Sequence, residues 1–131
     1  IAHVKGATMI DHVSIGVRDL AKAVALYEPL LSTLGHRKLT EEPGTVGFGK
    51  KYPEFWLNHR PNLAPQNDNG THVCLRCESM DAVNAFHAMA LSHGANSSGA
   101  PGLRSEYSEN YYAAFITDTD GNKIEVVTFV A

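Results

Sequence analysis

The chain has 131 residues, of which 44% are hydrophobic and 19% are charged, and its formal net charge is -3 at pH 7. This length and composition are typical of one globular domain with a buried core. The weakly acidic charge offers no basic surface for nucleic acid, and no apolar run approaches the roughly 20 residues that span a bilayer. We therefore expect a cytoplasmic protein that binds neither nucleic acid nor membrane.

Two stretches of the chain resemble each other. One reads "IDHVSIGVRDLAKAVALYEPL" from Ile10, and the other reads "GTHVCLRCESMDAVNAFHAMA" from Gly70. Each opens with a strand-like run that carries a histidine near its start, and each continues into a helix-like run. The repeat predicts a single domain of two modules, at about residues 9–60 and 70–131, with residues 1–8 as an N-terminal extension.

The first module is expected to contain a strand, a helix and three more strands. A strand is predicted at residues 10–17, and further strands at residues 37–39, 46–49 and 54–58. Between them, Asp19 is a suitable N-cap for a helix that ends at Gly35, and Pro29 predicts a kink or a local break inside it. The apolar positions on the buried side of this helix are Leu20, Val24, Tyr27, Leu31 and Leu34.

The second module repeats this order after a linker rich in Pro and Asn at residues 60–70. A strand is predicted at residues 72–77, and Ser79 caps a helix that ends at Gly94. A Gly- and Ser-rich loop at residues 97–110 precedes a hairpin of residues 111–117 and 123–129, joined by a "DTDGN" turn. The buried side of the helix is expected to carry Met80, Val83, Phe86 and Leu91. The pattern indicates an α+β fold with the order β-α-β-β-β twice.

The opening strands have one apolar face and one polar face. In the first strand Val13, Ile15 and Val17 alternate with polar or small residues, and His12 belongs to the polar set. In the second, the polar set is His72, Cys74 and Arg76. Imidazole, thiol and guanidinium groups are unsuited to a dry core, so this face favours a wet cavity. Because Cys74 and Cys77 lie three apart on a strand, we expect them to point to opposite faces and to remain two free thiols.

Three segments of the chain, "MIDHVSIGVRDLAKAVALYEPLL", "GTHVCL" and "YYAAFITDTDGNKIEVV", resemble the vicinal-oxygen-chelate superfamily in combination and order. This group includes glyoxalase I, fosfomycin-resistance proteins, bleomycin-resistance proteins and extradiol dioxygenases. The resemblance covers the chain from Met9 to Ala131. It implies a glyoxalase-like fold, in which two modules form curved mixed sheets around a cavity, and commonly a homodimer.

The resemblance also implies a metal site at His12, His72 and Glu125, with Glu125 as the catalytic group. Two imidazoles and one carboxylate can hold Zn, Ni, Mn, Fe or Co and leave positions for substrate or water. A single histidine on a strand is usually an ordinary polar residue. Two at matching places in a repeat, with a glutamate inside the apolar "KIEVV", favour a divalent-metal site.

The first module departs from the glyoxalase I pattern, which has a fourth, acidic ligand there. Aligning "FWLN" with "IEVV" puts Trp56 at the position of Glu125, and an indole cannot bind a metal. Glu54 or Asn58 could substitute, but neither matches directly. Trp56 is expected to form a cavity wall, with core packing as the alternative.

The candidate substrate-binding residues are Trp56, Asn58, Arg76, Tyr111 and Phe115. Arg76 could pair with a substrate carboxylate or phosphate, or it could be an exposed arginine at a strand end. The glycines around Arg104, Glu106, Tyr107 and Ser108 would permit a mobile lid, with a plain surface loop as the alternative. The other histidines, His3, His36, His59, His87 and His93, are expected at the surface.

These observations predict a metal-dependent enzyme of lyase, isomerase or thiol-transferase type, acting on a small oxygen-rich molecule. The first alternative is a metal-free protein that sequesters a small molecule or drug, as bleomycin-resistance proteins do. Dioxygenase chemistry is the second alternative, and a module with a vestigial site is the third. The histidine pair, which the sequestering relatives generally lack, favours the enzyme.

Overall fold

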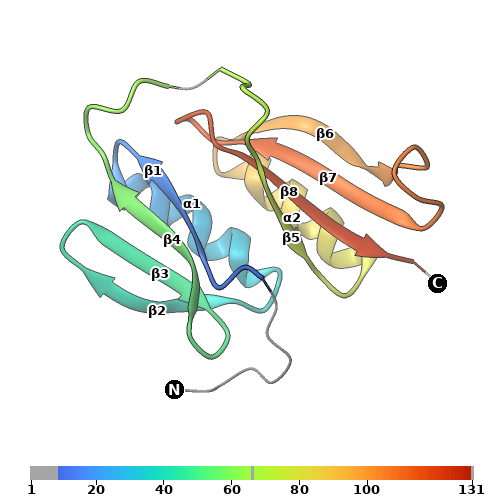
Figure 1. The fold of residues 1–131 in the computed structure, drawn as a ribbon, viewed down its shortest axis with the longest axis horizontal. Helices are drawn as coiled ribbons and strands as arrows, with labels where there is room; N and C mark the ends of the chain where they lie inside the picture. Colours follow the sequence, from blue (N-terminus) through green and yellow to red (C-terminus); the bar gives the residue numbers. More distant parts are fainter. Residues whose placement is uncertain (1–8, 66, 131) are drawn as a thin grey trace. The chain divides into compact units, whose positions relative to one another are not determined.

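The computed structural model describes residues 9–65 and 67–130, so the extension expected at residues 1–8 lies outside the described residues. The chain divides into two compact units, Ile1–Leu63 (unit 1) and Ala64–Ala131 (unit 2). Each unit has one helix and a four-stranded mixed sheet in the order β-α-β-β-β (Figure 1). The predicted α+β class and the β-α-β-β-β order of both modules are therefore confirmed. No helix in the described part of the chain has the length and hydropathy needed to span a membrane.

Unit 1 begins with β1 (Val13–Val17) and α1 (Leu20–Ser32), and continues with β2 (Arg37–Glu42), β3 (Thr45–Gly49) and β4 (Pro53–His59). The strand order is β1-β4-β3-β2, with β1 and β4 parallel and the other pairs antiparallel. The carboxylate of Asp19 accepts a hydrogen bond from the backbone N–H of Lys22, 3.1 Å away, which confirms the predicted N-cap.

The core of unit 1 lies between α1 and one face of its sheet. The helix buries Ala23, Leu26, Tyr27, Leu30 and Leu31. Leu20 and Val24, which were expected on this face, are only half-buried. The helix is continuous through Pro29, so the predicted local break does not occur. Pro29 is three residues from the helix end, and Ala25, whose carbonyl would lose its intrahelical donor, is exposed to water.

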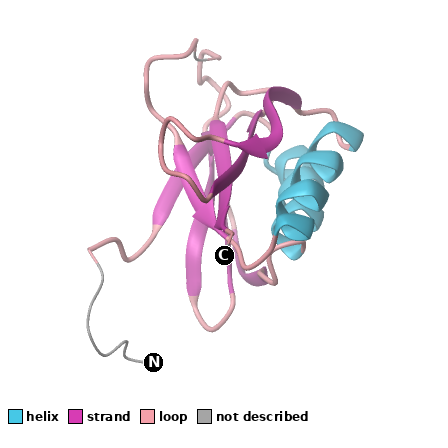
Figure 2. Cartoon of the chain, turned by 90° about the vertical axis from the view of Figure 1, so that its right-hand side faces the viewer, coloured by secondary structure: helices cyan, strands magenta, loops and turns pink. Residues whose placement is uncertain are grey.

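Unit 2 repeats the arrangement with β5 (Val73–Arg76), α2 (Met80–Ser92), β6 (Asn96–Leu103), β7 (Tyr111–Thr117) and β8 (Lys123–Phe129). The strand order is β5-β8-β7-β6, and only β5 and β8 are parallel. The helix α2 runs along one side of these strands (Figure 2). The predicted hairpin of β7 and β8 is confirmed, and the carboxylate of Asp118 accepts from the backbone N–H groups of Asp120 and Asn122 in its turn.

The buried face of α2 differs from the prediction. Met80 and Leu91 are each 43% exposed, whereas Val83, Phe86, His87 and Ala90 are buried. His87, expected at the surface, reaches inward, and its Nε2 lies 2.8 Å from the Ser97 hydroxyl on β6. Since buried polar groups need partners, this hydrogen bond explains how a histidine is tolerated there.

Much of the segment predicted as a loop at residues 97–110 is the edge strand β6, so the proposed lid is wrong for that part. Glycine and proline disfavour central strands but are tolerated at an edge, where one side of the strand needs no partner. The pairing of β6 with β7 is irregular, with register shifts between Ser97 and Gly99 and between Gly99 and Gly102. These irregularities explain why strand periodicity is absent from the sequence.

Cys74 and Cys77 are both free thiols, as predicted. The backbone N–H of Cys77 donates to the carbonyl of Val127, and its Sγ lies 3.5 Å from the carbonyl oxygen of Ser79. Neither of these contacts involves the sulfur atom of Cys74.

We expect Gly49→Ala to destabilise the protein by about 3 kcal/mol, because overpacking against backbone has a large cost. A Cβ at Gly49 would lie 2.0 Å from the carbonyl oxygen of Tyr52, in the turn between β3 and β4. Gly16→Ala is the matched control, since the closest atom to its Cβ would be Leu63 Cδ2 at an ordinary 3.4 Å. Urea unfolding measures both free energies, and equal values for the two variants would contradict the prediction.

Candidate functional site

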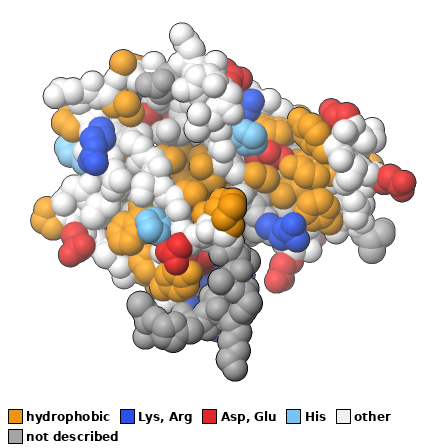
Figure 3. Space-filling view, in the orientation of Figure 1, with side chains coloured by type: hydrophobic (Ala, Val, Ile, Leu, Met, Phe, Trp, Pro, Cys, Tyr) orange, Lys and Arg blue, Asp and Glu red, His pale blue; other side chains and the backbone are white. Residues whose placement is uncertain are grey.

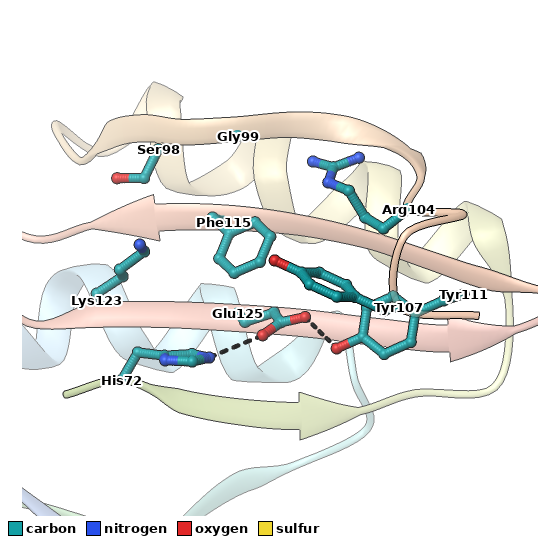
Figure 4. A pocket seen from close by; sticks show the side chains of 9 residues that line it. All are labelled: His72, Ser98, Gly99, Arg104, Tyr107, Tyr111, Phe115, Lys123 and Glu125. Carbon is teal, nitrogen blue, oxygen red and sulfur yellow. Dashed lines mark hydrogen bonds and ion pairs between the residues drawn. The ribbon is translucent and has the colours of Figure 1, made fainter. Parts of the chain in front are cut away.

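A pocket of about 520 Å³ lies on the face of the unit 2 sheet away from α2 (Figure 4). Its volume is within the range of small-molecule sites. The lining residues come from β6, β7 and β8, from the residue before β5 and from the turn after β6. They are His72, Ser98, Gly99, Arg104, Tyr107, Tyr111, Phe115, Lys123 and Glu125. On the face of the molecule that Figure 3 shows, hydrophobic, basic and acidic side chains are all present at the surface.

The carboxylate of Glu125 is the most buried charged group in this pocket. Alternation along β8 turns Ile124 and Val126 toward α2 and Glu125 toward the pocket, where Glu125 is 3% exposed. Its Oε1 lies 2.9 Å from Nε2 of His72, and its Oε2 accepts a hydrogen bond from the hydroxyl of Tyr111 (Figure 4). Both oxygens therefore have partners, as a buried carboxylate requires.

Tyr111 connects Glu125 to a thiol on the neighbouring strand. Its hydroxyl donates to the carboxylate, so its oxygen can accept from the Cys74 thiol, whose Sγ is 3.9 Å away. Burial, and then the hydrogen bond to Glu125, raise the pKa of Tyr111 well above its usual range. Desolvation, and then the Glu125 charge, raise the pKa of the Cys74 thiol to about 12. Both groups are therefore neutral near pH 7.

Aromatic rings form much of the remaining wall. Phe115 lies beside the imidazole of His72, with ring centroids 6.1 Å apart. Tyr111 makes edge contacts with Tyr107 on one side and Phe129 on the other, at 5.1 and 5.4 Å between centroids. These contacts hold Tyr111 between two rings while its hydroxyl reaches Glu125.

Four of the predicted site residues line this one pocket: His72, Glu125, Tyr111 and Phe115. Arg76 is not among its lining residues. The guanidinium of Arg76 instead lies over the ring of Phe129, 4.7 Å from the centroid, in a cation–π contact.

The remaining predicted residues belong to unit 1. His12 precedes β1, and its Nδ1 lies 2.8 Å from the carboxylate of Asp11. Trp56 and Asn58 share one face of β4. Trp56 packs over Gly47, where a Cβ would be 3.0 Å from the indole, and Asn58 accepts from the hydroxyl of Thr45 at 2.8 Å.

The sheet register supports the alignment of the two modules. Trp56 is opposite Ser14 in the parallel pair of β1 and β4, and Glu125 is opposite Cys74 in the pair of β5 and β8. Trp56 and Glu125 are thus equivalent positions, as the sequence alignment predicted.

Sequence reasoning missed Lys123, Ser98 and Gly99, and it treated Arg104 and Tyr107 only as residues of a loop. For Lys123 a signal was present, because it lies two residues before Glu125 and strand alternation puts both on one face. Ser98 and Gly99 had no comparable signal, since the strand that carries them is irregular.

His72 and Glu125 are suited to bind a metal together. Neighbouring ligands that each lie about 2.1 Å from one ion at a right angle are about 3 Å apart, and Nε2 and Oε1 are separated by 2.9 Å. Without a metal, the same contact is a hydrogen bond in which Nε2 donates, because a carboxylate only accepts. Within either unit, the described residues bring no third His, Cys, Asp or Glu to complete a site.

The family model for the glyoxalase/bleomycin resistance protein/dioxygenase superfamily matches residues 9–126. A solved glyoxalase/bleomycin resistance protein from Albidiferax ferrireducens T118 is 28% identical, with a TM-score of 0.82, and the match covers 92% of this chain and 99% of that one. No curated protein matches the chain.

Two more distant solved structures share the fold. A putative glyoxalase from Bacillus halodurans is 20% identical, with a TM-score of 0.65, over 92% of this chain and 95% of that one. The other is a mutant of the fosfomycin resistance protein FosX from Listeria monocytogenes, complexed with Mn(II) and 1S,2S-dihydroxypropylphosphonic acid. It is 13% identical, with a TM-score of 0.67, and the match covers 92% of this chain and 90% of that one. The family model spans nearly the whole chain and agrees with the two β-α-β-β-β units, so the chain belongs to the glyoxalase/bleomycin resistance protein/dioxygenase superfamily.

Proposed function

We propose that this protein is a metal-dependent enzyme of lyase, isomerase or thiol-transferase type that acts on a small oxygen-rich molecule. The observation that carries the proposal is the convergence of His72 Nε2 and Glu125 Oε1, 2.9 Å apart, in a pocket of small-molecule size. The Mn(II) in the FosX complex is consistent with a metal in this fold family. A divalent ion held there would act as a Lewis acid toward substrate oxygens.

His12 is the proposed third ligand, supplied by unit 1 of the same chain or of a second copy. The contact of its Nδ1 with Asp11 supports this role, because the carboxylate accepts a hydrogen bond from Nδ1–H and so favours the tautomer with a lone pair on Nε2. Zn, Ni, Mn, Fe and Co are all compatible with two imidazoles and one carboxylate. Trp56 and Asn58 are proposed to line the same cavity from unit 1.

The chain's own groups would bind and orient the substrate. Tyr111 occupies one oxygen of Glu125, which leaves the other oxygen directed toward His72. Phe115 provides an apolar wall beside that pair. Because the Tyr111 hydroxyl and the Cys74 thiol stay neutral near pH 7, neither adds a negative charge beside Glu125.

Metal titration by calorimetry tests the proposal directly. Removing one ligand in His12→Ala, His72→Ala or Glu125→Gln should weaken metal binding by more than about 100-fold, which exceeds the usual loss for an outer hydrogen-bond partner. His59→Ala is the matched control, because this exposed histidine lies at the end of β4 and its ring Nε2 is 3.1 Å from the backbone carbonyl of Arg18. If none of the five metals binds the wild-type protein, the metal-free sequestering function is favoured instead.

Tyr111→Phe should weaken metal binding by about 10–100-fold without unfolding the protein, since it removes the hydrogen bond that orients Glu125. Tyr112→Phe is the control, because it removes a hydroxyl whose partner is Asn84 on α2, 2.6 Å away. The same calorimetric titration measures both variants. Equal affinities for Tyr111→Phe and the wild type would mean that Tyr111 does not position the carboxylate.

The proposed assembly is a homodimer, as is common among members of this superfamily. In each unit the outer edge of β1 or β5 has no paired strand among the described residues, and such edges favour association. Light scattering at micromolar concentration should give twice the mass of the 14.2 kDa chain. If the protein has the mass of a monomer while metal saturates the site, then the site does not require a dimer.

A further inference from the structure

Two of the three basic side chains of unit 2 are beside one aromatic ring in the pocket. This unit contains Arg76, Arg104 and Lys123, against eight Asp or Glu residues. The guanidinium carbon of Arg104 lies 5.7 Å from the ring centroid of Phe115, and Nζ of Lys123 lies 5.4 Å from it. Figure 4 shows the two side chains on opposite sides of this ring. In an acidic unit, this grouping produces a local concentration of positive charge.

Arg104 is held in place by the backbone of β6. One of its guanidinium nitrogens donates to the carbonyl of Gly102 at 2.9 Å, and another donates to the carbonyl of Ala100 at 2.7 Å. A guanidinium has five N–H groups, so three remain after these two bonds. The described residues include no carboxylate that pairs with Arg104, and it is only partly exposed.

Two glycines leave the space that Arg104 occupies. A Cβ at Gly99 would be 3.2 Å from a guanidinium nitrogen and 2.9 Å from the Phe115 ring, and a Cβ at Gly102 would be 3.1 Å from the other nitrogen. Any side chain at these positions would displace the guanidinium or the ring. The irregular strand β6 therefore positions one cation against Phe115.

Lys123 is held by a weaker interaction. Its ammonium is 3.6 Å from the carboxylate of Asp68, whose side chain is 69% exposed. Exposed ion pairs of this kind contribute little, so an anion in the pocket can compete with Asp68 for the ammonium. Lys123 and Glu125 lie on the same face of β8, so the cationic side of the pocket adjoins the carboxylate.

We propose that the pocket has an oxyanion subsite beside the Phe115 ring, where Arg104 and Lys123 supply the positive charge, and that the ligand is a small organic anion with a carboxylate, phosphonate or phosphate group. The guanidinium fork suits such planar or tetrahedral oxyanions, and charge-assisted hydrogen bonds are the stronger class. The ligand's other oxygen atoms would then lie at His72 and Glu125, and this part of the proposal rests on the proposed function. Binding of the anionic group itself requires no metal.

The test is a calorimetric titration of the full-length, metal-depleted protein with methylphosphonate and, separately, with acetate. Arg104→Gln and Lys123→Gln should each weaken binding of the better probe by about tenfold or more, because each removes a charged partner. Arg76→Gln, which removes the third cation of the unit at a position outside the pocket lining, should leave the affinity unchanged. Comparing the two probes shows whether a tetrahedral or a planar oxyanion is preferred.

Asp68→Asn provides a variant that should gain affinity, since it removes the carboxylate that competes for Lys123. This gain cannot arise from misfolding, so it keeps the proposal testable if the Arg104 variant is unstable. Absence of binding by both probes, or equal losses in Arg76→Gln and Arg104→Gln, would overturn the subsite.

A parallel Mn²⁺ titration separates this proposal from the proposed function. Arg104→Gln should keep the wild-type Mn²⁺ affinity and lose anion binding, whereas Glu125→Gln should lose Mn²⁺ and keep anion binding. Anion binding in a wild-type protein that binds no metal would support the subsite while removing the metal-dependent function. Metal binding without anion binding would overturn the proposed subsite and leave the proposed function standing.

Discussion

Each four-stranded sheet of this protein has two faces, and each unit has one helix to cover them. The helix-side face is closed by apolar packing, as Ile124 and Val126 show at 0% exposure. Among the described residues no helix of the same unit covers the opposite face, so polar side chains there find partners in one another and in solvent. In unit 2 the buried carboxylate of Glu125 has its partners in His72 and Tyr111 on this face. The pocket is thus a consequence of how little of the sheet one helix can cover.

The two units use the same backbone plan for different chemistry. Their registers match position by position, but Glu125 of unit 2 corresponds to Trp56 of unit 1, and Cys74 corresponds to Ser14. At the corresponding positions, unit 1 has the imidazole of His12 with a carboxylate as its sequence neighbour, while unit 2 has an imidazole and a carboxylate 2.9 Å apart. A repeated fold need not produce a repeated site, because side chains facing a cavity are under less packing constraint than those in the core.

Charge is distributed unevenly within the pocket of unit 2. Glu125 stands beside His72, whereas Arg104 and Lys123 stand beside Phe115. The neutral Tyr111 and Cys74 surround the carboxylate and add no further charge near pH 7. The pocket therefore presents two chemically different groups of side chains to a ligand. A small molecule with two different ends can be oriented by such a pocket.

The sequence alone was sufficient for the order of elements in unit 1, the capped helices and the alignment of Trp56 with Glu125, because these depend on local periodicity and on an internal repeat. It also identified His72, Glu125, Tyr111 and Phe115, which share a pocket in unit 2. Tertiary structure decided the rest. Only strand pairing could make an edge strand of a Gly-rich segment, bury His87 against Ser97, and bring Arg104 and Lys123 to one ring. Those outcomes depend on contacts between residues distant in sequence, which no local pattern encodes.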